Sequence, residues 1–467
     1  MNLAQALRFV PLATHLRSVH PSGKILAAFI GAGGKTTALF RLARDLQSSY
    51  DSVFVSTSTH LALSQLELAD HRLNLRSPAD LSSLESNPPP GISVLVGPQA
   101  EAERVRGPEA AVLEVLAELA TEKRIPLLIE ADGSRLRPLK APADHEPVVP
   151  GFINTVVCVA GLSALGQPLT AEWVHRPDRF AALSGLAEGD RLTLEALGRV
   201  LMHPQGGLKG IPPGARRVLL LNQADTPALL ASARQLAVEL LSSFQAVVVT
   251  GQNKSSQLDG AAFFQPPVVY EPLAAIVLAA CEARRYGKPK QLLEWKGQPF
   301  VRHILQAGLS GELSSVLLVT GAYAAEITQA VTGLPVQVVF NPDWQHGLST
   351  SVKMGLRALP DNVGAAFFLL SDQPHLPVEL LRLMGELHAR TLSPLIAPYC
   401  QGRRANPALF DRVVFPDLMM LSGDTGGRSL FAKDSPYSVE WIYWDDPSLL
   451  LDVDTPSDYE RLLRLGT

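Results

Sequence analysis

Cysteine is scarce in this chain. Its three cysteines, Cys158, Cys281 and Cys400, lie far apart among 467 residues and form no CxxC pair. The sequence therefore gives no support for a disulfide framework or a cysteine-based zinc site, and a reducing compartment fits. No run approaches the roughly 18 apolar residues of a membrane helix, and the N-terminus lacks the apolar core of a signal peptide. These features predict a cytoplasmic protein without a membrane partner.

An excess of positive charge is also missing. The chain has 41 basic and 45 acidic side chains, which give a formal net charge of -4. This balance provides no reason to expect nucleic acid as a partner. The hydrophobic fraction of 46% and the charged fraction of 18% are typical of a globular protein. The length exceeds one ordinary core, so two or three domains are expected.

Short apolar runs alternate with amphipathic segments in both halves. This βαβ rhythm predicts doubly wound, mostly parallel α/β sheets. In the first half the predicted strands are ILAAFI, SVFVST, PLLIEAD, TVVCVAG, RRVLLLNQAD and QAVVVTG. The rhythm breaks at residues 251–271, which are predicted to be a linker between domains at 1–250 and 272–467. In the second half the predicted strands are LAAIVLAA, SSVLLVTG, VQVVFN, AAFFLLSD, LSPLIAPYC and VEWIYWDD.

The stretch FIGAGGKTT follows a predicted strand and opens a predicted helix. Glycines allow close backbone approach, and successive N–H groups at a helix N-terminus form an anion nest. The spacing departs from GxxxxGK[ST], because Phe29 stands where the first glycine would be. A glycine-rich turn with a solvated lysine is the alternative, but the strand-to-helix context favours phosphate binding. The candidate nucleotide-binding residues are Gly31, Gly33, Gly34, Lys35, Thr36 and Thr37, with Thr36 also a candidate magnesium ligand.

Two later strand ends extend this candidate site. PLLIEADGSR ends in Glu130 and Asp132, and Asp132 is a candidate magnesium-linked carboxylate. LLLNQAD ends in Asn222 and Asp225 and resembles the NKxD element that reads guanine, with Gln223 in place of the lysine. A plain strand-to-loop junction is equally compatible with LLLNQAD. The N-terminal domain is therefore expected to bind ATP or GTP.

The second half opens with a strand that leads into a basic loop carrying Arg285 and Lys290. Arginine can grip two phosphate oxygens, and lysine acts as a point charge on another. Asp372 follows the strand AAFFLL, and Asp454 lies in LLLDVDTP. Two carboxylates with basic groups suit a Mg²⁺-dependent attack on an α-phosphate with release of pyrophosphate. Arg285, Lys290, Asp372 and Asp454 are the predicted catalytic residues, and both aspartates are candidate metal ligands.

The blocks FIGAGGKTT, STSTH, EADGSRLRPLKAPADHEPVVP, VAGLSALGQPL, VHRP and LNQAD together resemble the selenium-dependent hydroxylase accessory protein family (YqeC-like). The resemblance covers roughly residues 1–250. It implies a role in the maturation of a molybdenum hydroxylase client and leaves the reaction open.

The blocks LAACEARRYGKPKQLL, NPDWQHGLSTSVKMGL, LLSDQPHL, GRRANPALF, SGDTGGRSLF and DVDTPSDY are similar to the MobA-like nucleotidyltransferases, and most to molybdenum-cofactor cytidylyltransferases. The resemblance implies a Rossmann-like domain that transfers CMP from CTP to molybdopterin. By motif it places the nucleotide at Leu278, Ala279, Ala280, Cys281, Arg285 and Lys290. It places the acceptor at Asn341, Gly347, Ser349, Ser351, Asn406, Gly423, Asp424 and Arg428.

Two departures from this pattern fall on the nucleotide loop and the acceptor loop. Cys281 replaces a glycine of the family's LAAG, and ANP at residues 405–407 replaces GHP. A catalytic thiol is disfavoured, because a thiol at a buried strand end usually behaves as a small apolar group. Two alternatives stay open. One is a nucleotide-dependent cofactor chaperone or scaffold without turnover. The other is a transferase for another phosphorylated acceptor, such as a sugar phosphate.

Overall fold

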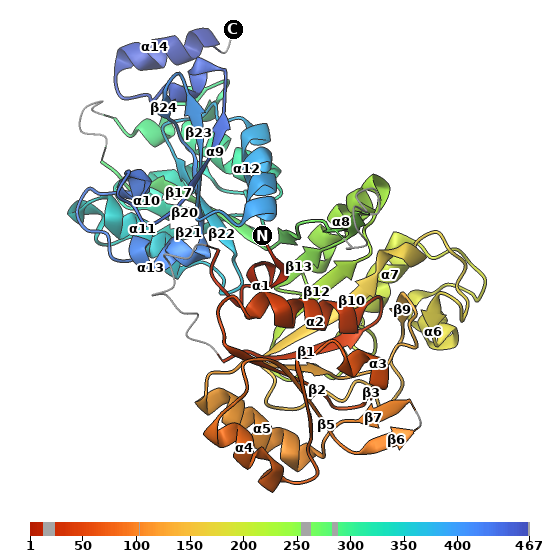
Figure 1. The fold of residues 1–467 in the computed structure, drawn as a ribbon. Coiled ribbons are helices and arrows are strands. Elements are labelled where there is room, and N and C mark those ends of the chain that lie inside the picture. Colours follow the sequence, from red (N-terminus) through yellow and green to blue (C-terminus); the bar gives the residue numbers. More distant parts are fainter. Residues whose placement is uncertain (13–23, 102, 254–262, 283–287, 466–467) are drawn as a thin grey trace. The chain divides into compact units, whose positions relative to one another are not determined.

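The protein is described here by a computed structural model covering residues 1–12, 24–101, 103–253, 263–282 and 288–465. The chain divides into two compact units, Met1–Tyr270 and Glu271–Thr467. Each unit is built around its own large sheet, flanked by helices (Figure 1). No helix in the described ranges combines the length and apolar character needed to cross a membrane.

A nine-stranded sheet organises the first unit, in the order β16-β13-β12-β10-β1-β8-β2-β5-β4. Its strands pair in parallel except β16, which runs antiparallel to β13. The strands are β1 (Leu26–Gly31), β2 (Ser52–Thr57), β4 (His71–Asn74), β5 (Gly91–Val96), β8 (Leu127–Glu130), β10 (Thr155–Gly161), β12 (Arg216–Asn222), β13 (Ala246–Val249) and β16 (Val268–Tyr270).

The helices of this unit are α1 (Leu3–Ala6), α2 (Lys35–Leu46), α3 (Leu63–Leu66), α4 (Ser82–Ser86), α5 (Ala110–Glu122), α6 (Pro177–Ser184), α7 (Leu194–Met202) and α8 (Pro227–Leu240). A three-stranded sheet, β3-β7-β6, comprises β3 (His60–Ala62), β6 (Gln99–Glu101) and β7 (Arg104–Arg106). Two short pairs are β9 (Leu139–Lys140) with β11 (Val174–His175) and β14 (Gln252–Asn253) with β15 (Phe263–Phe264).

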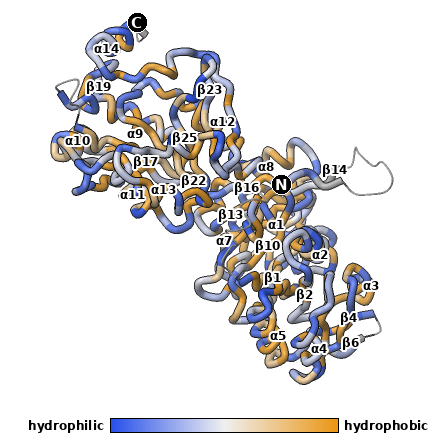
Figure 2. The backbone as a smooth tube through the Cα atoms, turned by 60° about the vertical axis from the view of Figure 1, so that its left-hand side comes forward, coloured by the Kyte–Doolittle hydropathy of each residue, from blue (hydrophilic) through white to orange (hydrophobic). Residues whose placement is uncertain are grey.

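The central strands read as continuous apolar runs because helices cover the sheet. Leu127, Phe54 and Val156 are fully buried and belong to one core with α5, α7 and α8. Figure 2 shows hydrophobic residues along these strands and hydrophilic residues in the connecting loops. The six strands predicted in the first half are confirmed as β1, β2, β8, β10, β12 and β13.

An eight-stranded sheet organises the second unit. Its path is β21-β20-β17-β22-β25-β23-β24, and β26 pairs with β23. The strands are β17 (Leu273–Ala279), β20 (Ser315–Thr320), β21 (Gln337–Phe340), β22 (Ala365–Leu370), β23 (Leu395–Cys400), β24 (Arg403–Arg404), β25 (Ala408–Asp411) and β26 (Val439–Tyr443). A separate hairpin joins β18 (Glu294–Trp295) and β19 (Gln298–Pro299). The helices are α9 (Phe300–Ser310), α10 (Ala324–Ala330), α11 (Leu348–Arg357), α12 (Val378–Thr391), α13 (Phe415–Leu418) and α14 (Pro456–Leu465).

The two units confirm the prediction of α/β domains with large, mostly parallel sheets. The predicted strands of the second half are β17, β20, β21, β22, β23 and β26. One boundary differs from the expectation. The stretch 251–271 was expected to link the domains, but its residues 268–270 form β16 and pair with β13. Val269 is buried there, so the end of this stretch extends the sheet of the first unit.

Candidate functional site

The glycine loop between β1 and α2 lies at the carboxyl edge of the first sheet, beside the ends of β8 and β10. Gly31 and Gly33 have φ angles of 94° and 81°. A Cβ on Gly33 would lie 2.3 Å from the backbone nitrogen of Gly161, so only glycine fits there. The loop is therefore packed tightly against β10.

The N–H groups of this loop are already bonded to the protein. Gly31 N donates to Asp132 Oδ2 (3.0 Å), Ala32 N to the Val159 carbonyl (2.8 Å) and Gly33 N to the Arg137 carbonyl (3.0 Å). The sequence predicts an open anion nest at these residues, but in this structure three of its donors have internal acceptors. A phosphate at this loop would have to displace them.

Lys35 is also held inside the protein. Its Nζ donates to the Gly31 carbonyl (2.8 Å) and pairs with Asp132 Oδ1 (3.1 Å), and both side chains are 2% exposed. Asp132 Oδ2 also pairs with Lys140 Nζ (2.8 Å), which reaches Glu146 Oε2 (2.9 Å). At the end of the series, Arg176 Nη1 lies 2.8 Å from Glu146 Oε2. Five charges of alternating sign thus form one ion-pair chain, and Asp132, predicted as a metal ligand, is engaged by two lysines.

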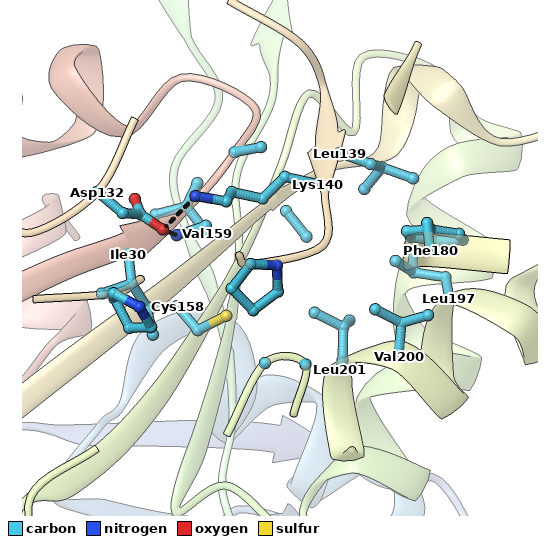
Figure 3. A pocket seen from close by; sticks show the side chains of 17 residues that line it. Ile30, Asp132, Leu139, Lys140, Cys158, Val159, Phe180, Leu197, Val200 and Leu201 are labelled. Atoms are coloured by element: carbon cyan, nitrogen blue, oxygen red, sulfur yellow. Dashed lines mark hydrogen bonds and ion pairs between the residues drawn. The ribbon is translucent and has the colours of Figure 1, made fainter. Parts of the chain in front are cut away.

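A small cavity of about 30 Å³ adjoins this chain. Figure 3 shows the Asp132–Lys140 pair on one side of it, with Cys158, Phe180 and Leu201 among the apolar side chains around the rest. That volume is about the share of one water molecule in the liquid. The cavity cannot hold a nucleotide, so it is a packing feature next to the charges. Burial raises the pKa of the Cys158 thiol to about 12, so this cysteine stays protonated.

Thr36 faces the other side of the loop and does not join the ion-pair chain. Its hydroxyl donates to Glu130 Oε2 (2.7 Å) and accepts from Gln65 Nε2 (3.0 Å). Burial raises the pKa of Glu130, while the charge of Lys35 opposes that rise. The side chains of Thr36, Gln65 and Glu130 line an open cleft of about 970 Å³. The ligand-accessible part of this edge is therefore at Thr36 and Glu130.

Asn222, predicted to read a base, ties β12 to the glycine loop instead. Its Nδ2 donates to the Gly33 carbonyl (2.8 Å), and its Oδ1 accepts from the Thr250 hydroxyl (2.9 Å). Both polar ends of the Asn222 side chain are therefore used within the protein. Asp225 lies half-buried three residues further on.

Three of the four predicted catalytic residues fall in the described part of the second unit, and they converge. Lys290 Nζ lies 2.6 Å from Asp454 Oδ1 and 3.3 Å from Asp372 Oδ2. Asp372 follows β22, next to the end of β17, so the constellation lies at the carboxyl edge of the sheet. Arg285 lies outside the described residues. This edge is where ligands bind in open α/β sheets.

A third carboxylate, Asp452, lies beside this cluster. It accepts a hydrogen bond from Gln373. Burial raises the pKa of Asp452, and the neighbouring Asp372 raises it further. Burial would lower the pKa of Lys290, but Asp372 and the hydrogen bond to Asp454 outweigh it, so the pKa is raised and the ammonium stays charged.

The expected nucleotide residues Leu278, Ala279, Ala280 and Cys281 form the end of β17 and the segment directly after it. Gln291 Nε2 donates to the carbonyls of Ala279 (3.3 Å) and Cys281 (3.0 Å), which fixes this segment. The expectation of a buried thiol is wrong, because Cys281 is exposed. Desolvation raises the pKa of its thiol, and Asp372 and Asp424 raise it further, so a reactive thiolate is disfavoured.

Four predicted acceptor residues come together where α11 begins. Ser349 N donates to the Gly423 carbonyl (3.1 Å), and Leu348 N donates to Asp424 Oδ1 (3.3 Å). Gly347 has a φ of 102°, and a Cβ there would lie 2.3 Å from the Gly423 carbonyl carbon. The loop around Gly423 is therefore docked on the N-terminus of α11.

Two other predicted acceptor residues are used internally. Asn341 is fully buried, and its Nδ2 donates to Thr350 Oγ1 (2.8 Å) and Ser351 Oγ (3.0 Å). Ser351 is 3% exposed. These side chains fix the loop before α11. Asn406 is half-buried, between β24 and β25.

Arg428, also predicted for the acceptor, belongs to a patch that the sequence did not reveal. The Arg404 guanidinium lies 4.8 Å from the Phe431 ring centroid. Phe431, Trp441 and Tyr399 follow one another at centroid distances of 6.0 and 5.4 Å. Burial lowers the pKa of Arg404, and the like charge of Arg428 lowers it further. Among the described residues no carboxylate pairs with either arginine.

Within the described ranges no group of three or more His, Cys, Asp or Glu side chains is arranged to hold a metal ion by itself. Asp372 and Asp454 nevertheless meet at one point, and Asp372 Oδ1 is a buried oxygen without a hydrogen-bond partner. Mg²⁺ characteristically takes one or two carboxylates and completes its shell with substrate phosphates and water. Asp372 and Asp454 fit this coordination preference.

Fold and site together define a two-domain α/β protein whose second domain has the architecture of a nucleotidyltransferase. Residues 27–178 match the family described as "YqeC protein", and residues 275–437 match the "MobA-like NTP transferase domain". The chain belongs to the YqeC family through its N-terminal half, and its C-terminal half matches the MobA-like NTP transferase domain.

Relatives are similar to one half or the other. The uncharacterized protein YqeC of Escherichia coli (strain K12) is 37% identical over 42% of this chain and 74% of its own length. Nicotine blue oxidoreductase of Paenarthrobacter nicotinovorans is 31% identical over 41% of this chain and 96% of its own length. Molybdenum cofactor cytidylyltransferase of Escherichia coli (strain K12) is 27% identical over 39% of this chain and 92% of its own length. A nucleotidyl transferase structure from Methanothermobacter thermautotroptrophicus has a TM-score of 0.37 at 22% identity. The match covers 42% of this chain and 97% of that structure.

Proposed function

We propose that the second unit transfers CMP from CTP to the phosphate of molybdopterin and releases pyrophosphate. We further propose that the first unit binds a nucleotide and assists the maturation of a molybdenum hydroxylase. The observation that carries the transferase proposal is Lys290 held between Asp372 and Asp454 at the carboxyl edge of a MobA-like sheet.

The chemistry required of the protein is positioning and charge stabilisation. An oxygen of the acceptor phosphate attacks the α-phosphorus, and the bond from that phosphorus to the bridging oxygen of the pyrophosphate breaks. Lys290 can leave the aspartates and neutralise the negative charge that grows on the departing pyrophosphate. Asp372 and Asp454 would hold Mg²⁺, which when bound supplies positive charge to the nucleotide oxygens. The attacking phosphate oxygen carries no proton, so no protein base is needed.

The patch of Arg404, Arg428 and the aromatic row Phe431–Trp441–Tyr399 supports a planar, phosphorylated acceptor. Aromatic rings offer stacking surfaces, and unpaired guanidinium groups bind phosphate. Arg428 follows the Gly423–Asp424 loop that docks on α11, and Asp424 is close enough to act on Cys281. The loop that leads to Arg428 thus lies near the segment expected to bind the nucleotide.

The experiment mixes the full chain with Mg²⁺, molybdopterin and CTP, GTP or ATP, and measures pyrophosphate release. We expect release with CTP that falls at least about a hundredfold in Lys290→Met and Asp372→Asn, as for loss of preorganised charge at a transition state. Lys296→Met is the matched control, because Lys296 stacks on Trp295 outside the site.

Other outcomes separate the alternatives. Nucleotide binding without release for any base would sink the transferase and favour a cofactor chaperone. Pyrophosphate release with a sugar phosphate, but not with molybdopterin, would identify the sugar phosphate as the acceptor. The name of one relative, nicotine blue oxidoreductase, points to a different reaction class, and absence of pyrophosphate release would turn attention to it.

A further inference from the structure

The open cleft of the first unit is a ligand site that the sequence motifs do not describe. Its volume of about 970 Å³ is at the upper end of small-molecule pockets. Thr36 and Glu130 lie in its lining together with residues of β3, β7 and the loop after β8. The cleft is therefore wide enough for a nucleotide-sized ligand, and it opens beside the N-terminus of α2.

The lining of this cleft is strongly basic. The carboxylates Glu109, Glu130 and Glu146 are outnumbered by five arginines and three histidines: Arg76, Arg104, Arg106, Arg135, Arg176, His60, His145 and His175. Glu146 is committed to Lys140 and Arg176. Burial and, to a smaller extent, the neighbouring Arg176 lower the pKa of His175 to about 4, so this imidazole stays neutral.

Three arginines of this cleft have no carboxylate partner among the described residues: Arg104, Arg106 and Arg135. Arg104 and Arg106 flank the buried Val105 on β7, so period-two alternation puts both on the same, exposed face. Free guanidinium groups gathered in a cleft are the usual receptor for phosphate.

The loop that carries Arg135 is held in a costly conformation. Arg135 and Leu136 have consecutive φ angles of 49° and 62°, and Leu136 is 95% exposed at the edge of the cleft. Left-handed backbone at two non-glycine residues costs energy and tends to occur at ligand sites. An almost fully exposed leucine there also offers apolar contact to a bound molecule.

We infer that this cleft binds a nucleoside triphosphate and holds its phosphates on Arg104, Arg106 and Arg135. The Gly31–Gly34 loop does not serve as the phosphate cradle, because Gly31, Ala32 and Gly33 donate to internal acceptors and Lys35 is paired with Asp132. The inference rests on the proposal that the first unit binds a nucleotide. It replaces the expected phosphate contacts with residues from β7 and the loop after β8.

Calorimetry on the full chain tests the inference with CTP, GTP, ATP and tripolyphosphate. Hydrogen exchange locates each ligand, since both units are expected to bind nucleotide. We expect a triphosphate to protect residues 103–109 and 133–137. We expect Arg104→Gln/Arg106→Gln to weaken this binding about a hundredfold, as for loss of two charge-assisted contacts. Arg72→Gln/Lys123→Gln, a pair of exposed cations outside the cleft, is the control and should bind normally.

Protection restricted to residues 31–37, or unchanged affinity in the double arginine variant, overturns the inference. Equal affinity for tripolyphosphate and every nucleotide overturns its nucleoside part. Misfolding of the variant is checked by its exchange pattern without ligand, and Arg135→Gln then provides a second test on another element. Failure of pyrophosphate release at the second unit would leave protection at 103–109 unaffected, so the two proposals fail separately.

Discussion

Replacement of Glu146 by glutamine should destabilise the first unit in a pH-dependent way. Glu146 accepts from Lys140 Nζ (2.9 Å) and from both terminal nitrogens of Arg176 (2.8 and 3.1 Å). Its side chain is only 12% exposed. Burial alone would raise the pKa of Glu146, but the hydrogen bonds from Arg176 and Lys140 outweigh it and lower the pKa to about 2.

The magnitude follows from linkage between protonation and folding. Lowering the pKa from 4.5 in the unfolded chain to about 2 in the folded protein corresponds to about 3 kcal/mol. Because the folded pKa is the lower one, this stability is present above pH 4.5 and is lost as pH falls toward 2. At pH 3 about half of it should remain. Glu146→Gln should therefore cost about 3 kcal/mol at pH 7 and about half of that at pH 3.

Urea titrations with pulsed hydrogen exchange on peptides from β8 and β10 report the unfolding of this unit separately from the second. Glu195→Gln is the control. Glu195 pairs with Arg199 at 2.7 Å, but the side chains are 79% and 44% exposed, and such pairs contribute less than about 1 kcal/mol. An equal loss at pH 7 and pH 3 in Glu146→Gln would mean that packing, not charge, explains the effect. No loss at pH 7 would refute the ion-pair reasoning altogether.

Three further predictions concern the strand ends. Gly33→Ala should destabilise the first unit by about 2–5 kcal/mol in urea titrations, because its Cβ would strike the Gly161 backbone at positive φ; normal stability would show that the loop can move. Cys281→Gly should change the KM for nucleotide with little change in kcat, and an unchanged KM for every nucleotide would make the thiol irrelevant to the site. Arg404→Gln should raise the KM for the acceptor about tenfold and leave the KM for nucleotide unaffected, as for loss of one charge-assisted contact; equal effects on both would remove Arg404 from the acceptor site.

Much of the fold is accessible from sequence because buried parallel strands read as apolar runs. All twelve predicted strands are present, and the helix predicted to open at FIGAGGKTT is α2. The edges of the sheets are harder to predict. β16 and the hairpin of β6 and β7 are only three residues long per strand, and an R-V-R alternation is too short a pattern to distinguish a strand from a loop.

The candidate site likewise has a part that can be predicted from the sequence and a part that cannot. Asp372 is predictable because it closely follows β22, and strand ends of a parallel sheet gather at one edge. Lys290 and Asp454 lie well beyond β17 and β26, so their place beside Asp372 is expected only from the family resemblance. The internal hydrogen bonds of the glycine loop are not predictable from the loop's own residues. Its N–H groups donate to the Val159 and Arg137 carbonyls and to Asp132, which belong to distant segments. The arginines of β7 were missed for a related reason, since their common exposed face follows from pairing with β3.

The two sheet edges use the same residue types with opposite consequences. At the first edge Asp132 lies between two lysines, with all three side chains at most 3% exposed. Removing one partner of such a buried group costs about 3–5 kcal/mol, so these charges are fixed in the folded state. At the second edge Lys290 lies between two aspartates, but the three side chains are 19–50% exposed. Solvent weakens these pairs, so Lys290 is free to leave the aspartates, as the proposed transfer reaction requires. Burial, and not the motif, therefore separates the lysine that is fixed in the fold from the lysine that is proposed to serve the reaction.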